Sequence, residues 1–353
     1  MKIPRETLAI RQAAERLADI FGASELAEDS KLGVRTIDSQ MWDAVFSIRG
    51  HCFVLEWKRS GSLGLVADAI RQLRMAQSSF PHEVIPLLAV PYMGEAAQKR
   101  CAQAELPWLD LSGNARIIVP GIFYQNLGHP NRFRRPGRPE SAFGPKGSRI
   151  TRLLLMEPAK AVRQRVIASS TGLNEGHVSR VVGKLLEAGL VEREADGIRA
   201  ADPGTLLDAW REEYRFDRHD VIRGHISAGG GESPTHSIAK ILSKADVPYA
   251  VTALAAAWLW TRHAGFRLST VYLTSHPSAA VKKALGFREE PRGANTWLVV
   301  PNDEGVFDGA ECVEGIPCVH PIQAYLDLKD HSERATEAAA EIRRRLLRGY
   351  DDP

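Results

Sequence analysis

The chain has 353 residues, of which 44% are hydrophobic and 25% charged, so we expect a globular protein with two or three domains. The formal net charge is only +3, but residues 131–200 hold 14 Lys and Arg against 7 Asp and Glu. This local excess of +7 leaves about −4 for the remainder, which indicates a polyanion partner for the middle of the chain. The alternative is a solvated basic surface without a partner.

The sequence also argues against several classes of protein. No apolar run approaches the roughly 20 residues of a membrane-spanning helix, so we expect no membrane partner. The N-terminal MKIPRETLAIRQAAERL predicts a charged amphipathic helix rather than a signal peptide. The four cysteines form no CxxC pair, which argues against structural zinc and disulfides and predicts a reducing, cytoplasmic location. These cysteines are Cys52, Cys101, Cys312 and Cys318.

The first predicted domain covers residues 1–128 and alternates helix and strand signals. Apolar residues at helical spacing predict a helix near 5–21, and two short strands follow near 43–48 and 52–58. The full order, α-β-β-α-β-α-β, predicts a mixed sheet covered by helices. The later elements are a helix at about 63–78, a strand at 85–91, a helix at about 94–104, and short strands within PWLDLSGNARIIV.

The predicted strand CFVLEWK carries two charged residues in an apolar run. Alternation places Glu56 and Lys58 together on one face, while the other face packs on the core. Asp43 begins the neighbouring strand of a tight hairpin, which brings its carboxylate within reach of Glu56. Two carboxylates and a backbone carbonyl suit Mg²⁺, and Lys58 would orient an attacking water or stabilise charge on a phosphate. The alternative is a charge cluster on a half-solvated sheet with no catalytic role.

This pattern resembles the signature of the PD-(D/E)xK nucleases, because Asp43 is followed after twelve residues by Glu56 and Lys58 in a Glu-x-Lys order. The resemblance implies a restriction-endonuclease-like fold, with Asp43 and Glu56 as ligands of Mg²⁺ and Lys58 as a catalytic residue. It also implies a polar contribution from the following helix, where Gln72 is the matching candidate. The first helix of such nucleases often adds an acidic residue, for which Glu15 is the candidate.

The short DLSGN stretch allows two interpretations of Asp110. In the first, Asp110 faces the cluster of Asp43 and Glu56 and adds another acidic group. In the second, which we favour, Gly113 and Asn114 form a tight turn in which the side chains of Asp110 and Ser112 bond backbone amides.

A linker is predicted at 129–145, because HPNRFRRPGRPESA is rich in Pro, Gly, Arg and Asn. Its RRPGRP stretch partly resembles an AT-hook. That resemblance implies minor-groove contacts from Arg134, Arg135 and Arg138. The alternative is that these arginines only form a charged tether.

Residues 146–203 predict a winged helix-turn-helix domain. Helices are expected near 148–156 and 161–169, followed by a turn in STGLN and a third helix in EGHVSRVVGKLLEAG. Two short strands around Asp196-Gly197 complete the order with a hairpin. In winged helices the third helix enters the major groove of DNA, although such domains also serve as protein-interaction modules.

The third helix of this domain carries the candidate DNA contacts. Its valines and leucines form an inward stripe, and the opposite side carries donors for base edges or phosphates. These donors are His177, Ser179, Arg180 and Lys184.

Residues 204–353 predict a C-terminal α/β domain, with helices in PGTLLDAWREEYRF, at 235–244 and near the C-terminus, and strands near 268–273 and 296–300. The motifs PWLDLSGNARI, LLDAWREEY and VPYAVTALAAAWL resemble the AbiEi-type antitoxins. The resemblance implies a DNA-binding autorepressor paired with a nucleotidyltransferase-like toxin. In those antitoxins the winged helix lies near the N-terminus, whereas here it is predicted in mid-chain.

The sequence thus predicts a multidomain α/β (α+β) protein that binds double-stranded DNA, as a transcription regulator or antitoxin-like factor, with a nuclease-fold N-terminal domain. The alternative function is a Mg²⁺-dependent DNA endonuclease that uses Asp43, Glu56 and Lys58 and is targeted by the winged helix. A third interpretation makes the later domains interaction modules of a defence complex. A homodimer is the default expectation for DNA binding.

Overall fold

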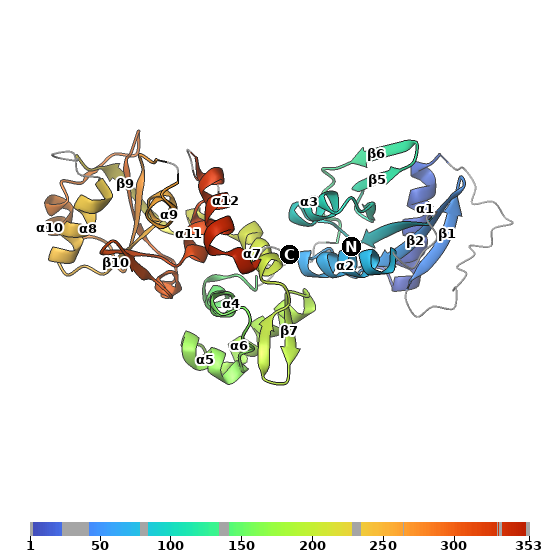
Figure 1. The fold of residues 1–353 in the computed structure, drawn as a ribbon, viewed down its shortest axis with the longest axis horizontal. Helices are drawn as coiled ribbons and strands as arrows, with labels where there is room; N and C mark the ends of the chain where they lie inside the picture. Colours follow the sequence, from blue (N-terminus) through green and yellow to red (C-terminus); the bar gives the residue numbers. More distant parts are fainter. Residues whose placement is uncertain are drawn as a thin grey trace. The chain divides into compact units, whose positions relative to one another are not determined.

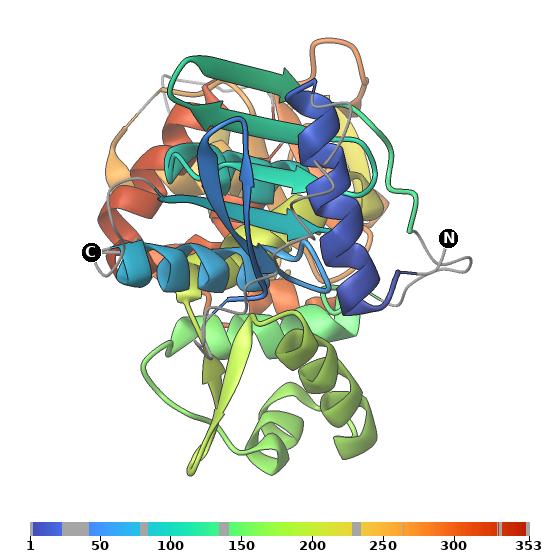
Figure 2. The same ribbon diagram turned by 90° about the vertical axis from the view of Figure 1, so that its right-hand side faces the viewer.

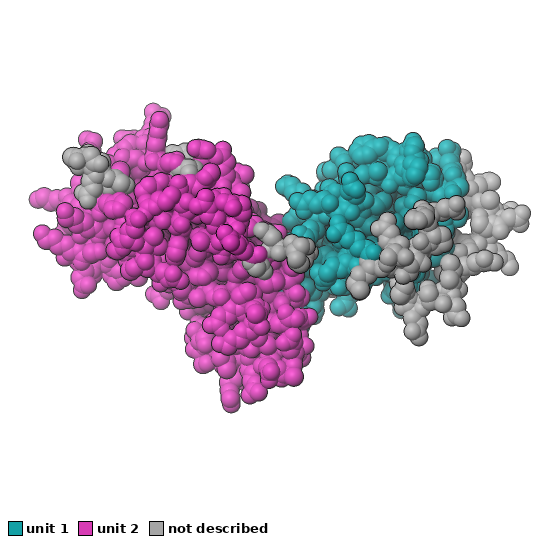
Figure 3. All heavy atoms as spheres, in the orientation of Figure 1, with its two compact units in different colours: residues 1–140, 184–191 teal, residues 141–183, 192–353 magenta. Residues whose placement is uncertain are grey.

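The structure is a computed structural model, and the chain has a mixed α/β fold, as the sequence predicts. The part of the chain that it describes forms two compact units, coloured separately in Figure 3. The first unit comprises residues 1–140 and 184–191, and the second comprises 141–183 and 192–353. No helix in the described part is both long and apolar enough to cross a bilayer. The described residues are 3–22, 42–77, 84–133, 141–227, 234–263, 265–329, 331 and 334–350.

The first unit is built on a six-stranded sheet whose strands follow one another in chain order (Figure 1). The first two strands form an antiparallel hairpin, the second to fourth strands are parallel, and the last two are again antiparallel. Helices form the crossovers between the parallel strands, as parallel pairing requires. The strands are β1 (Ala44–Ile48), β2 (His51–Trp57), β3 (Val84–Val90), β4 (Trp108–Asp110), β5 (Ala115–Val119) and β6 (Ile122–Asn126). The helices are α1 (Glu6–Ile20), α2 (Leu63–Gln77) and α3 (Glu95–Gln103).

Both faces of this sheet are covered at β2. Helix α1 lies across one face (Figure 2), where Leu17 packs in one core with Phe53 and Leu55. Residues whose side chains point to the other face of the sheet, such as Val54 and Leu88, are also fully buried. The sheet is therefore covered on both faces at β2, as predicted for a mixed sheet covered by helices, because α2 also contacts it at β3; the half-solvated surface of the alternative interpretation is absent there. The predicted order of elements is present, and β6 is an additional strand that the sequence analysis did not predict.

The DLSGN stretch forms a tight turn between β4 and β5, as we favoured from the sequence. Asp110 Oδ1 accepts hydrogen bonds from the amides of Ser112 (2.9 Å), Gly113 (2.8 Å) and Asn114 (2.9 Å). Its Oδ2 accepts from the Met93 amide (3.0 Å) and from Asn114 Nδ2 (2.8 Å). The side chain is completely buried. Because both oxygens are saturated by these donors, the alternative role of Asp110 as an added acidic group of the cluster is wrong.

The segment 145–200 has the predicted order of helix, helix, tight turn, helix and hairpin (Figure 1). Gly172 ends the second helix in a left-handed conformation, with φ of 66°. The side chain of Asn174 caps the third helix by accepting from the His177 amide at 2.8 Å, as predicted for an N-cap. A single bridge between Val162 and Ile198 adds a third short stretch to the hairpin. The elements are α4 (Pro145–Met156), α5 (Gln164–Thr171), α6 (Glu175–Glu187), β7 (Val191–Glu194) and β8 (Gly197–Ala200).

The C-terminal region carries a seven-stranded mixed sheet with helices. The strand order is β12-β9-β13-β11-β10-β15-β14, with parallel pairing only between β11 and β13 and between β10 and β15 among the described strands. The strands are β9 (Asp220–His225), β10 (Tyr249–Thr252), β11 (Ser269–Leu273), β12 (Arg288–Glu289), β13 (Thr296–Val300), β14 (Glu311–Val313) and β15 (Ile316–Cys318). The helices are α7 (Pro203–Glu213), α8 (Pro234–Lys244), α9 (Ala253–Thr261), α10 (Ala279–Ala284), α11 (Pro321–Asp327) and α12 (Ala335–Leu346), with 3₁₀ turns η1 (Phe216–Arg218), η2 (Glu304–Phe307) and η3 (Arg348–Tyr350).

Helix α4 forms several hydrogen bonds with this C-terminal region within the second unit. Arg149 forms two hydrogen bonds to Asp303, at 2.7 Å from Nε to Oδ1 and 3.0 Å from Nη2 to Oδ2. One turn further, Arg152 donates from Nη2 to the side-chain oxygen of Gln323 on α11. The Tyr350 hydroxyl donates to a backbone carbonyl at the end of α4. Helix α4 and the C-terminal region therefore share a folded interior within the second unit.

We expect Asp110→Ala to lower the free energy of unfolding of the first unit by on the order of 3 kcal/mol, because it leaves several buried N–H donors without an acceptor. Thermal unfolding monitored by circular dichroism measures this change. The control is Asp19→Ala, an exposed carboxylate of the same unit, for which we expect a change within about 0.5 kcal/mol. Equal unfolding curves for the two variants would show that the turn does not depend on Asp110.

Candidate functional site

The first candidate site lies where the hairpin of β1 and β2 ends. The register pairs Ala44 with Leu55, so Asp43 continues to the position opposite Glu56. Asp43 Oδ2 accepts a hydrogen bond from the Trp57 amide at 2.7 Å, which fixes the carboxylate beside β2. The hairpin therefore brings together the two carboxylates that the sequence suggested as a pair.

Lys58 connects this pair to α2. Its Nζ lies 2.7 Å from Glu56 Oε1 and donates to Gln72 Oε1 at 3.1 Å. Gln72 is placed by α2, the helix that follows β2 directly. The structure thus gathers Asp43, Glu56, Lys58 and Gln72 at one location, although their chemical roles stay predictions.

Glu56 is held in an environment that disfavours its charge. The residue is only 9% exposed, and burial is the main cause that raises the pKa of its carboxyl group. Lys58 lowers this pKa through its hydrogen bond and charge, while the charges of Asp43 and Asp68 raise it. Asp68 lies on α2 and was not a sequence candidate. A cation bound beside Glu56 would favour the ionised carboxylate and offset the effect of burial.

The donor atoms of this site fit a hard divalent cation in chemical type. Glu56 Oε2 and Asp43 Oδ1 have no hydrogen-bond donor among the described residues, and Asp43 Oδ2 is fixed by the strand. Oxygen ligands of this kind suit Mg²⁺. No group of three or more His, Cys, Asp or Glu side chains with metal-binding geometry occurs in the described part of the chain. A metal held here would therefore depend on two carboxylates, a backbone carbonyl and water.

The first helix does not contribute to this site. Glu15 on α1 pairs with Arg11 at 2.8 Å, and both side chains are largely exposed. The predicted acidic contribution from Glu15 is not among the charges that shift the pKa of Glu56. The helix instead uses its alanine and leucine side chains to cover the sheet.

The second candidate site is the outer side of α6. Ser179 and Arg180 are exposed, while Val178, Val181 and Val182 are buried on the inward stripe. Helical periodicity places donors three and four residues apart on one side of the helix. This arrangement agrees with the inward and outward positions that the sequence predicts.

Two of the predicted donors on α6 are less accessible. Lys184 is partly buried. His177 is also partly buried, and its Nε2 atom is shielded from solvent without a hydrogen-bond partner among the described residues. In this conformation His177 Nε2 does not face solvent, and of the four predicted donors only Ser179 and Arg180 are fully exposed residues.

The basic surface is smaller than the local charge of the sequence suggests. Arg152 is buried, and Arg149 is bonded to Asp303. In the hairpin, Arg199 pairs with Glu192 and with Glu194, so its charge is already neutralised. The linker candidates Arg134, Arg135 and Arg138 lie outside the described residues.

Helix α5 presents two further cations that the sequence analysis did not single out. Arg163 and Arg165 lie at its start and are both exposed. The first helix of a helix-turn-helix pair commonly crosses the phosphate backbone, so these residues are candidate phosphate contacts. Their signal in the sequence is the Arg-x-Arg spacing in AVRQRVIAS, before a helix of otherwise neutral residues.

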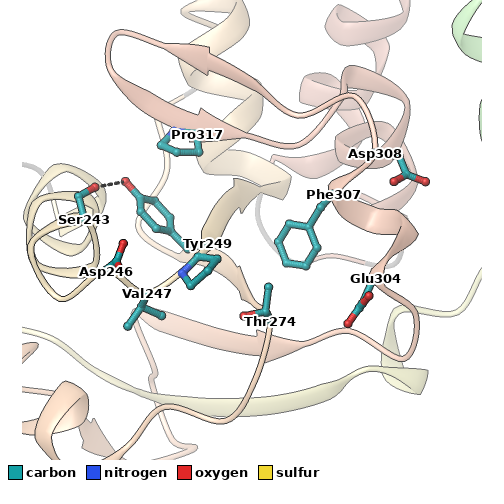
Figure 4. Close-up of a pocket in the computed structure, with 10 residues that line it drawn as sticks. Ser243, Asp246, Val247, Tyr249, Thr274, Glu304, Phe307, Asp308 and Pro317 are labelled. Carbon is teal, nitrogen blue, oxygen red and sulfur yellow. Dashed lines mark hydrogen bonds between the residues drawn. The ribbon is translucent and has the colours of Figure 1, made fainter.

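A separate cavity of about 620 Å³ opens in the C-terminal region (Figure 4). The rings of Tyr249 and Phe307 line it from opposite sides, and the Tyr249 hydroxyl lies 3.1 Å from Ser243 Oγ. Its lining includes three carboxylates, and no basic side chain, so it is unsuited to a phosphate group. The carboxylates belong to Asp246, Glu304 and Asp308.

No protein-family model, no curated protein and no solved structure matches the chain. The resemblances to nucleases and antitoxins therefore stay predictions from the sequence.

We expect Mn²⁺, as a probe for Mg²⁺, to bind the first unit through Asp43 and Glu56. Asp43→Asn and Glu56→Gln should each weaken binding about tenfold or more, measured by isothermal titration calorimetry. Because the pKa of Glu56 is raised, protons compete with the metal at higher pH than at an ordinary glutamate, and the wild-type affinity should fall as pH falls. The control Glu15→Gln should leave binding unchanged. Equal affinities for all variants would contradict this site.

Proposed function

We propose that the chain binds duplex DNA through the segment 145–200, which acts as a winged helix, and serves as a transcription regulator or antitoxin-like factor. The observation that carries the proposal is the two-sided character of α6. Its apolar stripe is buried, and Ser179 and Arg180 remain exposed for base edges or phosphates. The exposed Arg163 and Arg165 on α5 would contact phosphates beside the groove.

The hairpin contributes less charge to this proposal than the helices do. Arg193 is exposed, but Arg199 is neutralised, and Glu192, Glu194 and Asp196 make the hairpin acidic overall. Acidic side chains oppose close approach to phosphates. The DNA footprint that we propose therefore rests on α5 and α6 rather than on the hairpin.

The partner of such a regulator also belongs to the proposal. The resemblance to AbiEi-type antitoxins supports a nucleotidyltransferase-like toxin as the cognate protein, and a homodimer is the default expectation for such a regulator. The first unit would then be a nuclease-type fold, in keeping with its order of elements and its hairpin of β1 and β2. A regulator of this kind would not need the first unit to cut DNA.

A specific observation favours a second function, a Mg²⁺-dependent DNA endonuclease. Lys58 Nζ is held between Glu56 and Gln72, beside Asp43. When bound, Mg²⁺ would polarise the scissile phosphate and lower the pKa of a water ligand. Lys58 would stabilise negative charge on the phosphate, and Gln72 would hold Lys58 in position. The segment 145–200 would bind the DNA substrate and so bring it to this site.

Fluorescence anisotropy with labelled duplex DNA tests the DNA-binding proposal. We expect Arg180→Ala and Arg165→Ala each to weaken binding about five- to tenfold and to lower the slope of log K against log salt by about 1 if the lost contact is to phosphate. The matched control is Arg292→Ala, an exposed arginine of the C-terminal region, which should bind like wild type. Equal losses in all three variants, or no binding by wild type, would contradict the proposal.

Plasmid nicking tests the endonuclease proposal. We expect supercoiled plasmid to be nicked in the presence of Mg²⁺ or Mn²⁺ but not of EDTA, and Lys58→Ala and Glu56→Ala to lower the rate by at least about a hundredfold. Arg180→Ala should lower the rate through weaker binding, and excess enzyme should restore it. If wild type binds DNA but does not nick it, the endonuclease proposal is wrong and the regulator proposal stands.

A further inference from the structure

A small polar cavity lies inside the second unit, where the start of α4, the end of α7 and the turn before η2 meet. It has a volume of about 40 Å³, which is room for roughly three water molecules. Arg152 and Trp210 form part of its wall, and Arg215 and Arg218 line it from positions that are exposed to solvent. The cavity is therefore both buried on one side and reachable from the surface.

The side chain of Arg152 is the unusual feature of this cavity. It is 2% exposed, and its guanidinium lies 5.1 Å from the centre of the Trp210 ring. Its Nη2 donates to Gln323, but Nε and Nη1 have no acceptor among the described residues. An arginine side chain stays protonated in proteins, so these buried donors keep their charge as well as their hydrogens. Buried donors of this kind require a partner.

Several carboxylates lie around Arg152, and the charge of Asp308 affects it most, but none of them accepts from its Nε or Nη1 among the described residues. Asp303 lines the cavity but accepts from Nε and Nη2 of Arg149 and from the Gly305 amide. Glu213 accepts from Ser141 Oγ at 2.5 Å. Asp327 meets Arg152 only through Gln323, whose Nε2 donates to Asp327 Oδ1 at 2.7 Å. None of these three carboxylates bonds the guanidinium of Arg152 directly.

His219, the histidine of the wall, is neutral at pH 7. Burial, followed by the charge of Arg152, lowers its pKa to about 4. Its Nε2 lies 2.9 Å from the Tyr214 hydroxyl, and its Nδ1 accepts from the Asn302 amide at 3.1 Å. His219 therefore neither supplies a negative charge nor accepts from Arg152.

We propose that this cavity binds a small tetrahedral oxyanion, either inorganic phosphate or the phosphoryl group of a small metabolite. Nε and Nη1 of Arg152 each offer a charge-assisted donor to an oxygen of the anion, from different edges of the guanidinium, because the Nη2 atom that lies between these edges is bonded to Gln323. Arg215 and Arg218 supply positive charge at the mouth. The site is distinct from the DNA-binding surface on α5 and α6 and does not depend on the function proposed for that surface.

The site also has a structural consequence for α4. Arg152 belongs to α4, whereas Gln323 belongs to α11 and Asn302 follows β13. An anion held by Arg152 would therefore contact elements on both sides of the joint between the segment 145–200 and the C-terminal region. Its binding would stabilise this joint in the folded protein.

Isothermal titration calorimetry of the full-length, DNA-free protein with inorganic phosphate, in low-salt buffer without other oxyanions, tests this proposal. We expect one phosphate per chain, with affinity lowered about tenfold or more in Arg152→Met and several-fold in Arg218→Gln. The charge-matched control Arg292→Gln should bind like wild type. A second titration with adenosine monophosphate distinguishes the sources: tighter binding than phosphate identifies a phosphorylated metabolite, and equal or weaker binding identifies the free anion.

Three results would overturn the proposal. The first is no heat of binding with phosphate up to about 10 mM, a concentration at which even millimolar affinity is visible; ordered water then fills the cavity. The second is undiminished binding in a folded Arg152→Met variant. The third is a loss that follows Arg180→Ala instead, which would place the anion on the DNA-binding surface. If circular dichroism shows that Arg152→Met does not fold, the phosphate affinity of Arg218→Gln is compared with that of the control Arg292→Gln. Equal phosphate affinities of these two variants would overturn the site.

Discussion

The buried guanidinium of Arg152 is the constraint on which the second unit depends. A charge removed from water is costly unless its donors are satisfied, so the surrounding elements must supply acceptors and aromatic contacts. Gln323 on α11 supplies one acceptor, and the Trp210 ring on α7 supplies a cation–π contact. One residue of α4 thereby fixes the positions of two helices from the C-terminal region. Helix α4 is consequently packed into the second unit and is not joined to it by a free tether.

The hydrogen bonds that begin at Arg152 continue through Gln323 to the carboxylate of Asp327. Unlike Glu56, this carboxylate has both oxygens bonded to protein donors. Asp327 is completely buried and accepts from Thr252 Oγ1 (2.5 Å), Gln323 Nε2 (2.7 Å) and the hydroxyls of Tyr272 (3.0 Å) and Tyr214. Burial raises its pKa to about 6, although each of these donors lowers it. Since the unfolded pKa is near 3.8, the folded state binds more protons between about pH 4 and 6, and stability falls as pH rises through that window.

A comparison of the buried carboxylates separates structural from functional candidates. Asp110 and Asp327 have both oxygens bonded to protein donors, so neither has capacity left for a ligand. Glu56 is also buried and also has a raised pKa, but one of its oxygens has no donor among the described residues. Asp43 continues the hairpin register to the position opposite Glu56. Satisfaction of hydrogen bonds, rather than burial or pKa alone, therefore singles out the site at Glu56.

The sequence predicted elements and spacing well where local chemistry decides them. The hairpin before Glu56, the cap at Asn174 and the turn at Asp110 all follow from side chains acting on nearby backbone. Long-range partners could not be predicted in this way. The burial of the Glu56 face depends on how the helices pack on the sheet, and the effect of Asp68 on Glu56 depends on the position of α2. Strands β9, β10, β12, β14 and β15 were missed because their segments are short and alternate weakly, and β9 also pairs with a strand far along the chain.

Charge counted along a sequence is not charge presented to a partner. Among the basic residues of 131–200, Arg149 and Arg152 point into the C-terminal region, and Arg199 is neutralised within its own hairpin. These residues raise the local count without contributing to an external field. The exposed cations of Arg163, Arg165 and Arg180 are carried by two successive helices, α5 and α6. The distribution of charge over these helices, more than the excess of +7, is therefore the physical basis for expecting a polyanion partner.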